Sequence, residues 1–223
     1  MSPLKIAHRG LCKKAPENSL QAFLEAQSGR VEGVELDLQW HPEGKIFALH
    51  DDTLARTHGI HQELRDLPLA TINELHKPFA LPTLNEILEQ ASNQVLHLEI
   101  KIPDSHFSKP LDLNCFLEQM VSELKNHPLP LGSTLASFQP EVLKILNHQK
   151  LNLPLTGIAE SRLQLACMEK LTFLDYLSIA PSLIPFAQRP ESQMWIWGVT
   201  EIQTIEALGH DWIGVISDHF PAN

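Results

Sequence analysis

Basic residues are scarce in this sequence, and so are cysteines and long apolar runs. The 223 residues include 17 Lys and Arg against 27 Asp and Glu, which gives a formal net charge of −10. Because nucleic acids and anionic membranes attract proteins through basic surface, we expect no nucleic acid among the partners. No segment approaches the run of about 18 apolar residues that a membrane-spanning helix needs, so we also expect no stable membrane insertion.

The three cysteines are odd in number and widely spaced, at Cys12, Cys115 and Cys167. Such thiols are typical of a reducing compartment rather than of a disulfide framework. The first residues run directly into an apolar segment, without the charged and apolar regions of a signal peptide. We therefore predict a cytoplasmic protein. The lack of repeats and of Gly/Ser-rich linkers predicts one domain over residues 1–223, and the oligomeric state is left open.

Short apolar segments rich in β-branched residues alternate with segments of helical periodicity. We predict strands at Leu4–Ala7, Val34–Leu38, Ile46–Leu49, Val95–Ile100, Thr134–Phe138, Leu153–Ile158, Tyr176–Ile179, Trp195–Val199 and Ile213–Ile216. We predict helices at Ser19–Gln27, Leu84–Ala91, Leu113–Leu124, Pro140–Asn147, Gln164–Leu171 and Glu201–Leu208. Strands that alternate with helices form parallel βα units, and this number of units favours a TIM-type (β/α)8 barrel of the α/β class.

Two irregularities of this barrel are expected. Nine strand candidates exceed the eight of an ideal barrel, and Gln39–Lys45 is too short for a crossover helix between the second and third. We therefore predict a hairpin near residues 34–50 and leave open that one weak strand lies outside the barrel. Residues 52–82 are polar and carry prolines, which indicates an excursion from the barrel. It ends where Thr83 is expected to cap a helix with Glu86 as its partner.

Alternation with period two places polar side chains on one face of each of two predicted strands. The second candidate contributes Glu35, Asp37 and Gln39, and the fourth contributes His97, Glu99 and Lys101. This face points into the barrel, where unpaired carboxylates are costly. Three carboxylates therefore indicate one divalent cation, and all-oxygen ligation favours Mg²⁺ or Ca²⁺ over Zn²⁺, with Mn²⁺ as a further candidate. The alternative is a set of internal salt bridges with Lys101 or Arg9 that has no chemical role.

Histidines end two of the predicted strands. His8 follows the first strand and His50 the third, and catalytic groups in a barrel collect at strand ends. Two such histidines beside a carboxylate cluster indicate acid–base catalysis. Arg9 is suited to a phosphate oxygen because its guanidinium donates two parallel hydrogen bonds, and Lys101 adds a point charge.

Three neighbouring residues receive weaker interpretations. We interpret Asp51 as the start of a polar turn rather than as the partner of His50. His97 is either an orienting group or a hydrogen-bonded core histidine. Asp218 either closes the site or caps a turn, and we assign it no catalytic role.

These residues lie in segments that resemble the glycerophosphodiester phosphodiesterase family, whose fold is a phospholipase-C-like TIM barrel. The matching segments are His8-Arg9-Gly10, Pro16-Glu17-Asn18-Ser19 with Ala22-Phe23, Glu35-Leu36-Asp37, His50-Asp51 with Arg56-Thr57, Leu81-Pro82-Thr83-Leu84-Asn85-Glu86, Glu99-Ile100-Lys101, Ser137-Phe138 and Ile216-Ser217-Asp218. The resemblance spans essentially the whole chain, and it is specific in the N-terminal half and loose in the C-terminal half.

The resemblance implies metal-dependent hydrolysis of a small-molecule glycerophosphodiester to an alcohol and sn-glycerol 3-phosphate. It implies His8 and His50 as general acid and base, Glu35, Asp37 and Glu99 as metal ligands, Arg9 and Lys101 as phosphate contacts, and Phe138 and Trp197 as pocket residues. Which histidine is the acid stays open, as does the nucleophile, water or the glycerol 2-hydroxyl. The family's Trp-Thr-Val-Asn is replaced by Trp197-Gly198-Val199-Thr200, and residues 159–193 match weakly.

Three other functions are weighed against this one. The same site could cleave a lysophospholipid or a phosphoinositide, with the apolar segment at residues 181–186 as a membrane-facing rim or a buried loop. A non-catalytic barrel that binds phosphodiesters is a second alternative. A metal-dependent sugar isomerase or aldolase would explain the carboxylates but gives no reason for His8 and Arg9 together with His50.

Overall fold

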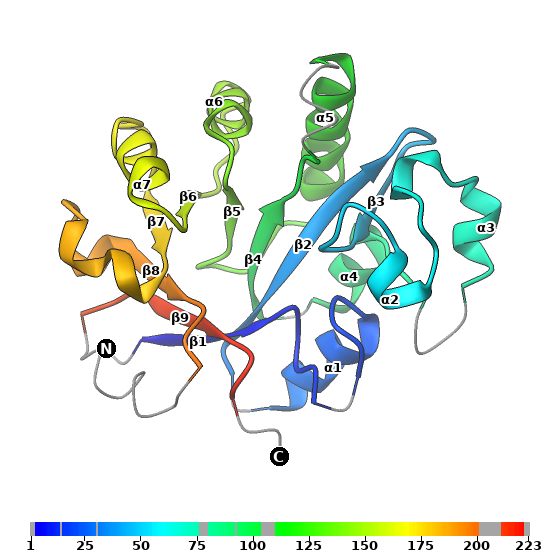
Figure 1. Cartoon of the computed structure of the whole chain (residues 1–223), viewed down its shortest axis with the longest axis horizontal. Helices are drawn as coiled ribbons and strands as arrows, with labels where there is room; N and C mark the ends of the chain where they lie inside the picture. Colours follow the sequence, from blue (N-terminus) through cyan, green and yellow to red (C-terminus); the bar gives the residue numbers. More distant parts are fainter. Residues whose placement is uncertain are drawn as a thin grey trace.

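The computed structural model describes residues 3–13, 15–29, 31–75, 80–91, 93–103, 110–200 and 211–220. Within these residues the strands form one nine-stranded sheet that closes on itself, with the helices outside it (Figure 1). The strands are β1 (Leu4–His8), β2 (Gly33–His41), β3 (Lys45–Ala48), β4 (Val95–Ile100), β5 (Thr134–Ser137), β6 (Leu155–Ala159), β7 (Tyr176–Ile179), β8 (Met194–Trp197) and β9 (Gly214–Ser217). The described strands therefore include all nine predicted ones.

Pairing between the first and last strands closes the barrel. The sheet order is β1-β9-β8-β7-β6-β5-β4-β2-β3, and β1 also pairs with β2 in parallel. Every pairing is parallel except that of β3, which runs antiparallel to β2 in the register Leu38↔Ala48 to His41↔Lys45. The predicted hairpin and the TIM-type barrel are thus confirmed. β3 is the strand outside the closed ring of parallel strands.

The described helices fall between the strands, as predicted. They include α1 (Leu20–Ser28), α4 (Leu84–Gln90), α5 (Pro110–Asn126), α6 (Pro140–His148) and α7 (Arg162–Glu169), with the short 3-10 segments η3 (Pro181–Phe186) and η4 (Glu191–Gln193) before β8. The predicted helix at Glu201–Leu208 lies outside the described residues. No helix among the described residues is both long and apolar enough to cross a bilayer.

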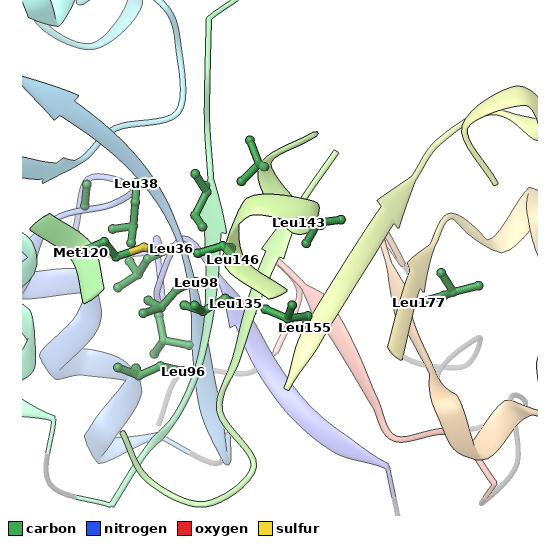
Figure 2. Packing of buried hydrophobic residues seen from close by; sticks show 14 of the residues in the cluster. Leu36, Leu38, Leu96, Leu98, Met120, Leu135, Leu143, Leu146, Leu155 and Leu177 are labelled. Carbon is green, nitrogen blue, oxygen red and sulfur yellow. The ribbon is translucent and has the colours of Figure 1, made fainter. Parts of the chain in front are cut away.

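The main core lies between the barrel wall and the outer helices. Leu36 and Leu38 of β2 and Leu96 and Leu98 of β4 are fully buried, and they belong to one cluster with Met120 of α5 (Figure 2). These leucines alternate along their strands with the polar residues of the period-two pattern. The apolar face is therefore taken up by the helices, and the polar face points into the barrel.

A separate apolar cluster fills the barrel interior toward the N-terminal ends of the strands. It joins Ile6, Val95, Trp195 and Ile216, and Trp195 is fully buried. Since this end is closed by apolar side chains, polar chemistry is confined to the C-terminal ends of the strands.

The described residues of the predicted excursion, 52–75 and 80–82, leave the barrel as predicted and have a small core of their own. They contain α2 (Ala55–His58), η1 (Leu64–Asp66) and α3 (Leu69–Asn73), and their buried residues pack with the β3 hairpin in a second cluster of Phe47, Leu49, Leu54, Leu64, Leu67 and Ile72. The chain returns at Thr83, whose hydroxyl accepts from the Glu86 N–H while the Glu86 carboxylate accepts from the Thr83 N–H. This capping box confirms the predicted start of α4.

Candidate active site

Three buried carboxylates meet where β2 and β4 run side by side. Glu35, Asp37 and Glu99 each offer an oxygen within 4.8 Å of the others, and Asp37 is the register partner of Glu99. Oε1 of Glu35 is buried and accepts no hydrogen bond from a described residue. Burial first, and then the charge of Asp37, raises the pKa of Glu35 and of Glu99. Buried carboxylates repel one another, and a cation that they coordinate together offsets this repulsion. The all-oxygen donor set fits a hard divalent ion.

Two cationic side chains partly neutralise this cluster. Lys101 Nζ lies 3.0 Å from Glu99 Oε1 and 3.6 Å from Asp37 Oδ1, and Arg9 Nε lies 3.3 Å from Asp37 Oδ2. The salt bridges considered as an alternative therefore exist. They do not balance the cluster, because the two side chains carry less positive charge than the three carboxylates carry negative charge, and Arg9 is also held by Glu17 at 3.0 Å.

The turn that ends β1 directs backbone and side chain of Arg9 toward the carboxylates. Arg9 has a φ of 54°, in the left-handed region that non-glycine residues rarely adopt, and its N–H donates to Glu35 Oε2 at 3.0 Å. Gly10 follows with a φ of 86°, where an added Cβ would lie 2.7 Å from backbone and side-chain carbons of Ala22. The turn before α1 thus requires a glycine at position 10, and it brings Arg9 to the carboxylates at the cost of backbone strain.

Asn18 holds a carboxylate of the candidate site and was not among the predicted site residues. Its Nδ2 donates to Asp37 Oδ2 at 2.8 Å, and its Oδ1 accepts from the Asp37 N–H at 3.2 Å. Asn18 is buried and has a φ of 53°, so it reaches across to β2 from the loop before α1. The segment around Asn18 was part of the family resemblance, and asparagine is one of the non-glycine residues that most readily adopt this φ. These were the signals that could have identified it.

His8 has a carboxylate partner from the far end of the chain. Its Nδ1 lies 2.8 Å from Asp218 Oδ1, and its Nε2 lies 3.8 Å from Glu35 Oε2. Burial by itself would lower the pKa of His8, but the hydrogen bond to Asp218 and the charge of Glu35 outweigh it and raise the pKa to about 9. Asp218, to which we assigned no catalytic role, therefore closes the site at β9 and sets the orientation of the imidazole.

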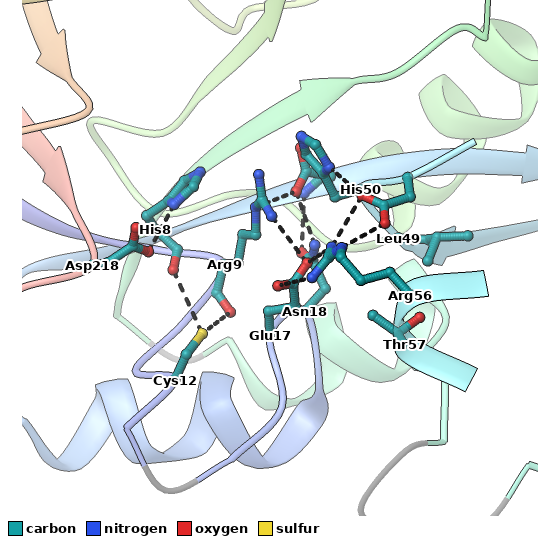
Figure 3. A network of polar contacts seen from close by, with 12 residues as sticks. His8, Arg9, Cys12, Glu17, Asn18, Leu49, His50, Arg56, Thr57 and Asp218 are labelled. Carbon is teal, nitrogen blue, oxygen red and sulfur yellow. Dashed lines mark hydrogen bonds and ion pairs between the residues drawn. The ribbon is translucent and has the colours of Figure 1, made fainter. Parts of the chain in front are cut away.

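His50 is also held by a carboxylate, and here the preferred sequence interpretation was wrong. Its Nδ1 lies 2.7 Å from Asp51 Oδ1, and Asp51 accepts from Arg56 at 2.6 Å and 3.0 Å (Figure 3). Arg56 in turn binds Glu17, the carboxylate that also holds Arg9. The hydrogen bond from Arg56 lowers the pKa of Asp51 to about 2, and burial lowers the pKa of His50. Asp51 is thus the partner of His50 rather than only a turn residue.

All nine predicted site residues line one cavity of about 560 Å³ at the C-terminal ends of the strands. Phe138 and Trp197 form its aromatic wall, with ring centroids 6.0 Å apart and planes nearly perpendicular. Lys101 Nζ lies 5.8 Å from the centroid of Phe138, and Trp197 Nε1 donates to the Ala159 carbonyl at 3.3 Å. The segment Pro181–Phe186 does not line this cavity; it buries Leu183 and leaves Phe186 partly exposed beneath the Arg162 guanidinium.

His97 lies in the wall of the same cavity but is neither of the two things considered for it. It is 1% exposed, its ring stands edge-on to Trp195 at 5.6 Å, and neither ring nitrogen has a hydrogen-bond partner among the described residues. Burial lowers its pKa to about 4. His97 is therefore a neutral, apolar-packed residue below the carboxylates.

A sequence model of the glycerophosphoryl diester phosphodiesterase family matches residues 8–195, from the end of β1 to β8. The chain belongs to the glycerophosphoryl diester phosphodiesterase family. The expected family and enzyme class are confirmed. A glycerophosphodiester phosphodiesterase from Caldanaerobacter subterraneus subsp. tengcongensis is 27% identical over 98% of this chain and 95% of its own. One from Bacillus subtilis is 28% identical over 74% of this chain and 62% of its own.

Solved structures share the barrel of this phosphodiesterase. Glycerophosphodiester phosphodiesterase from Thermotoga maritima superposes with a TM-score of 0.74 at 20% identity, covering 98% of this chain and 95% of that one. An Oleispira antarctica phosphodiesterase in complex with the product sn-glycerol-3-phosphate superposes with a TM-score of 0.75 at 22% identity, covering 96% and 93%. These likenesses support the fold.

Proposed function

We propose that this family member hydrolyses small-molecule glycerophosphodiesters to an alcohol and sn-glycerol 3-phosphate with the help of one divalent cation. The observation that carries the proposal is a single cavity in which three buried carboxylates stand beside two histidines, each with its own aspartate. The nearly full-length relative named as a glycerophosphodiester phosphodiesterase supports the substrate class.

Glu35, Asp37 and Glu99 would hold the cation, which when bound polarises a phosphate oxygen and offsets charge that develops at phosphorus. Mg²⁺, Ca²⁺ and Mn²⁺ all suit an all-oxygen donor set. Arg9 and Lys101 add positive charge at the edge of the same carboxylate cluster, where they would contact the phosphate. Phe138 and Trp197 would pack against the remainder of the substrate.

His8 and His50 would carry out the proton transfers. The Nδ1 atoms of both rings are bound to aspartates, so Nε2 is the nitrogen of each that can exchange a proton with substrate. One ring would accept a proton from the attacking hydroxyl group, and the other would donate a proton to the leaving alcohol. In the view of Figure 3, Arg9 lies between His8 and His50.

The proposal is tested by measuring release of sn-glycerol 3-phosphate from glycerophosphocholine with EDTA and then with Mg²⁺, Ca²⁺ or Mn²⁺ restored. We expect turnover only with a cation, and we expect H8A and H50A to lower kcat by roughly 10²–10⁴-fold. H148A, at an exposed position of α6, should leave kcat unchanged. Cation-independent turnover, or near-normal rates in both histidine variants, would contradict the mechanism.

We further propose that the chain acts in the cytoplasm as one domain over residues 1–223, without nucleic acid or stable membrane insertion. The three cysteines, none of them in a disulfide, support a reducing compartment. The continuous closed sheet supports a single domain.

A further inference from the structure

The aromatic side of the cavity differs in charge from the side that holds the carboxylate cluster. Among the described residues, the cationic side chains that line the cavity already have carboxylate partners: His8 with Asp218, Arg9 with Glu17 and Asp37, and Lys101 with Glu99. The imidazole of His50 is likewise held by Asp51. Glu160, on the opposite wall, is exposed, and its carboxylate has no partner within the described part of the chain. Its charge is therefore available to a ligand.

The local structure fixes Glu160 at the rim beside Trp197. Glu160 directly follows β6, and its backbone N–H donates to Gln164 Oε1 at 3.1 Å within the capping box of α7. Trp197 ends β8 and reaches across β7 to donate to the carbonyl of Ala159, the residue before Glu160. Trp197 and Glu160 thus line the same side of the cavity.

Trp197 is the aromatic ring that a ligand cation can use here. Phe138 already has the Lys101 ammonium 5.8 Å from its centroid, whereas Trp197, within the described part of the chain, makes an edge-type contact with Phe138, a hydrogen bond through Nε1 and apolar contacts with the interior cluster, and no described cation stacks on it. Aromatic faces attract ammonium groups, and a neighbouring carboxylate adds to that attraction. Neutral or anionic groups gain nothing from either.

We propose that Glu160 and Trp197 form the subsite for the leaving alcohol and select alcohols that carry an ammonium or trimethylammonium group. The inference rests on the proposed function, since it names which glycerophosphodiesters that site prefers. With the phosphate at the carboxylate cluster of β2 and β4, the cationic end of a choline or ethanolamine diester extends toward β6 and β8. Glu160 is then a specificity-determining residue that takes no part in proton transfer.

The test compares kcat/KM for glycerophosphocholine and glycerophosphoglycerol in the wild type, E160Q and the matched control E191Q. Glu191 is an exposed glutamate of η4 that does not line the cavity. We expect E160Q to lower the choline-to-glycerol ratio of kcat/KM by about three- to tenfold, because it removes one exposed charge, whose attraction is modest in energy, and leaves Trp197 in place. E191Q should leave the ratio unchanged.

Inhibition by tetramethylammonium chloride gives a second readout that does not involve turnover of a choline diester. Its inhibition constant for glycerophosphoglycerol hydrolysis should rise by a similar factor in E160Q. An unchanged ratio in E160Q, or an equal loss for both substrates, would overturn the subsite while leaving the proposed function intact. A wild type that hydrolyses neither substrate with any cation would instead overturn the proposed function.

Discussion

At the residue scale, the site depends on side chains that hold the candidate ligands. Asp37 is fixed from two directions by Asn18, which both donates to its carboxylate and accepts from its backbone N–H. Outer partners of this kind orient a ligand and are worth about 10–100-fold in metal affinity. Asn18 belongs to no strand, and only the folded chain shows that it faces Asp37.

We expect N18G to weaken Mn²⁺ binding by about 10–100-fold, because it removes both hydrogen bonds to Asp37. Glycine is chosen because the φ of 53° at this position would strain alanine. Isothermal titration calorimetry measures the affinity, and N85A, on the exposed face of α4, is the control. Unchanged Mn²⁺ affinity in N18G would show that Asn18 stabilises only the conformation of the loop before α1.

The raised pKa of Glu35 predicts that the metal-free protein loses stability as pH rises. In the unfolded chain a glutamate titrates near pH 4.3, whereas burial and the charge of Asp37 raise the folded pKa above that value. Between the two pKa values the unfolded state releases its proton more readily, so stability present at low pH is lost as pH increases through the folded pKa.

In EDTA at pH 8, E35Q should therefore melt above the wild type, by about 2–4 °C for each kcal/mol of burial cost removed. The difference should shrink toward pH 5. Adding Mn²⁺ should raise the melting temperature of the wild type and leave that of E35Q nearly unchanged. A constant difference across this pH range, or equal stabilisation of both proteins by Mn²⁺, would refute the linkage.

At the element scale, the turn between β1 and α1 holds His8 and Arg9 in the site because it packs closely against α1. G10A places a Cβ 2.7 Å from Ala22 at a φ of 86°, so both strain and a backbone clash oppose it. We expect a loss of roughly 2 kcal/mol or more, together with reduced kcat because His8 and Arg9 shift with the turn.

Gly59 provides the matched comparison, since its φ is 71° but nothing lies within 4 Å of an added Cβ. G59A should therefore cost only the backbone strain, on the order of 1 kcal/mol, and leave kcat unchanged. Urea unfolding and steady-state kinetics of the two variants separate clash from strain. Equal losses of unfolding free energy in G10A and G59A would show that the close approach of Gly10 to α1 does not contribute to stability.

The elements themselves were predictable because each carries its own periodicity. Period-two alternation placed Glu35, Asp37 and Glu99 inside the barrel, and the short connection before β3 predicted the hairpin. Contacts between residues that lie far apart in the sequence could not be predicted in this way. Asp218 is 210 positions from His8, and no local pattern reports that β9 lies beside β1.

At the scale of the whole molecule, closure of the sheet brings the ends of the chain to one site. Pairing of β1 with β9 brings His8 to Asp218, and pairing of β1 with β2 brings His8 beside Glu35. The same closure places Asp51, beyond the β3 hairpin, in one network with Glu17 before α1. Local positive charge is thus assembled from several segments of a chain whose overall charge is −10.

That overall charge predicts opposite salt responses for differently charged substrates. Glycerophosphoglycerol carries one negative charge and is repelled at long range, whereas glycerophosphocholine is zwitterionic and nearly indifferent to the field. Between about 10 mM and about 300 mM salt the Debye length falls from about 30 Å to under 10 Å. We therefore expect kcat/KM for glycerophosphoglycerol to increase about two- to threefold over this range, and that for glycerophosphocholine to stay level or fall slightly.

Stopped-flow or steady-state assays at low substrate concentration measure both values of kcat/KM, with NaCl and KCl compared to exclude a specific ion effect. A decline for the anionic diester would mean that the paired cations of the cavity, rather than the acidic surface, control the approach of the substrate.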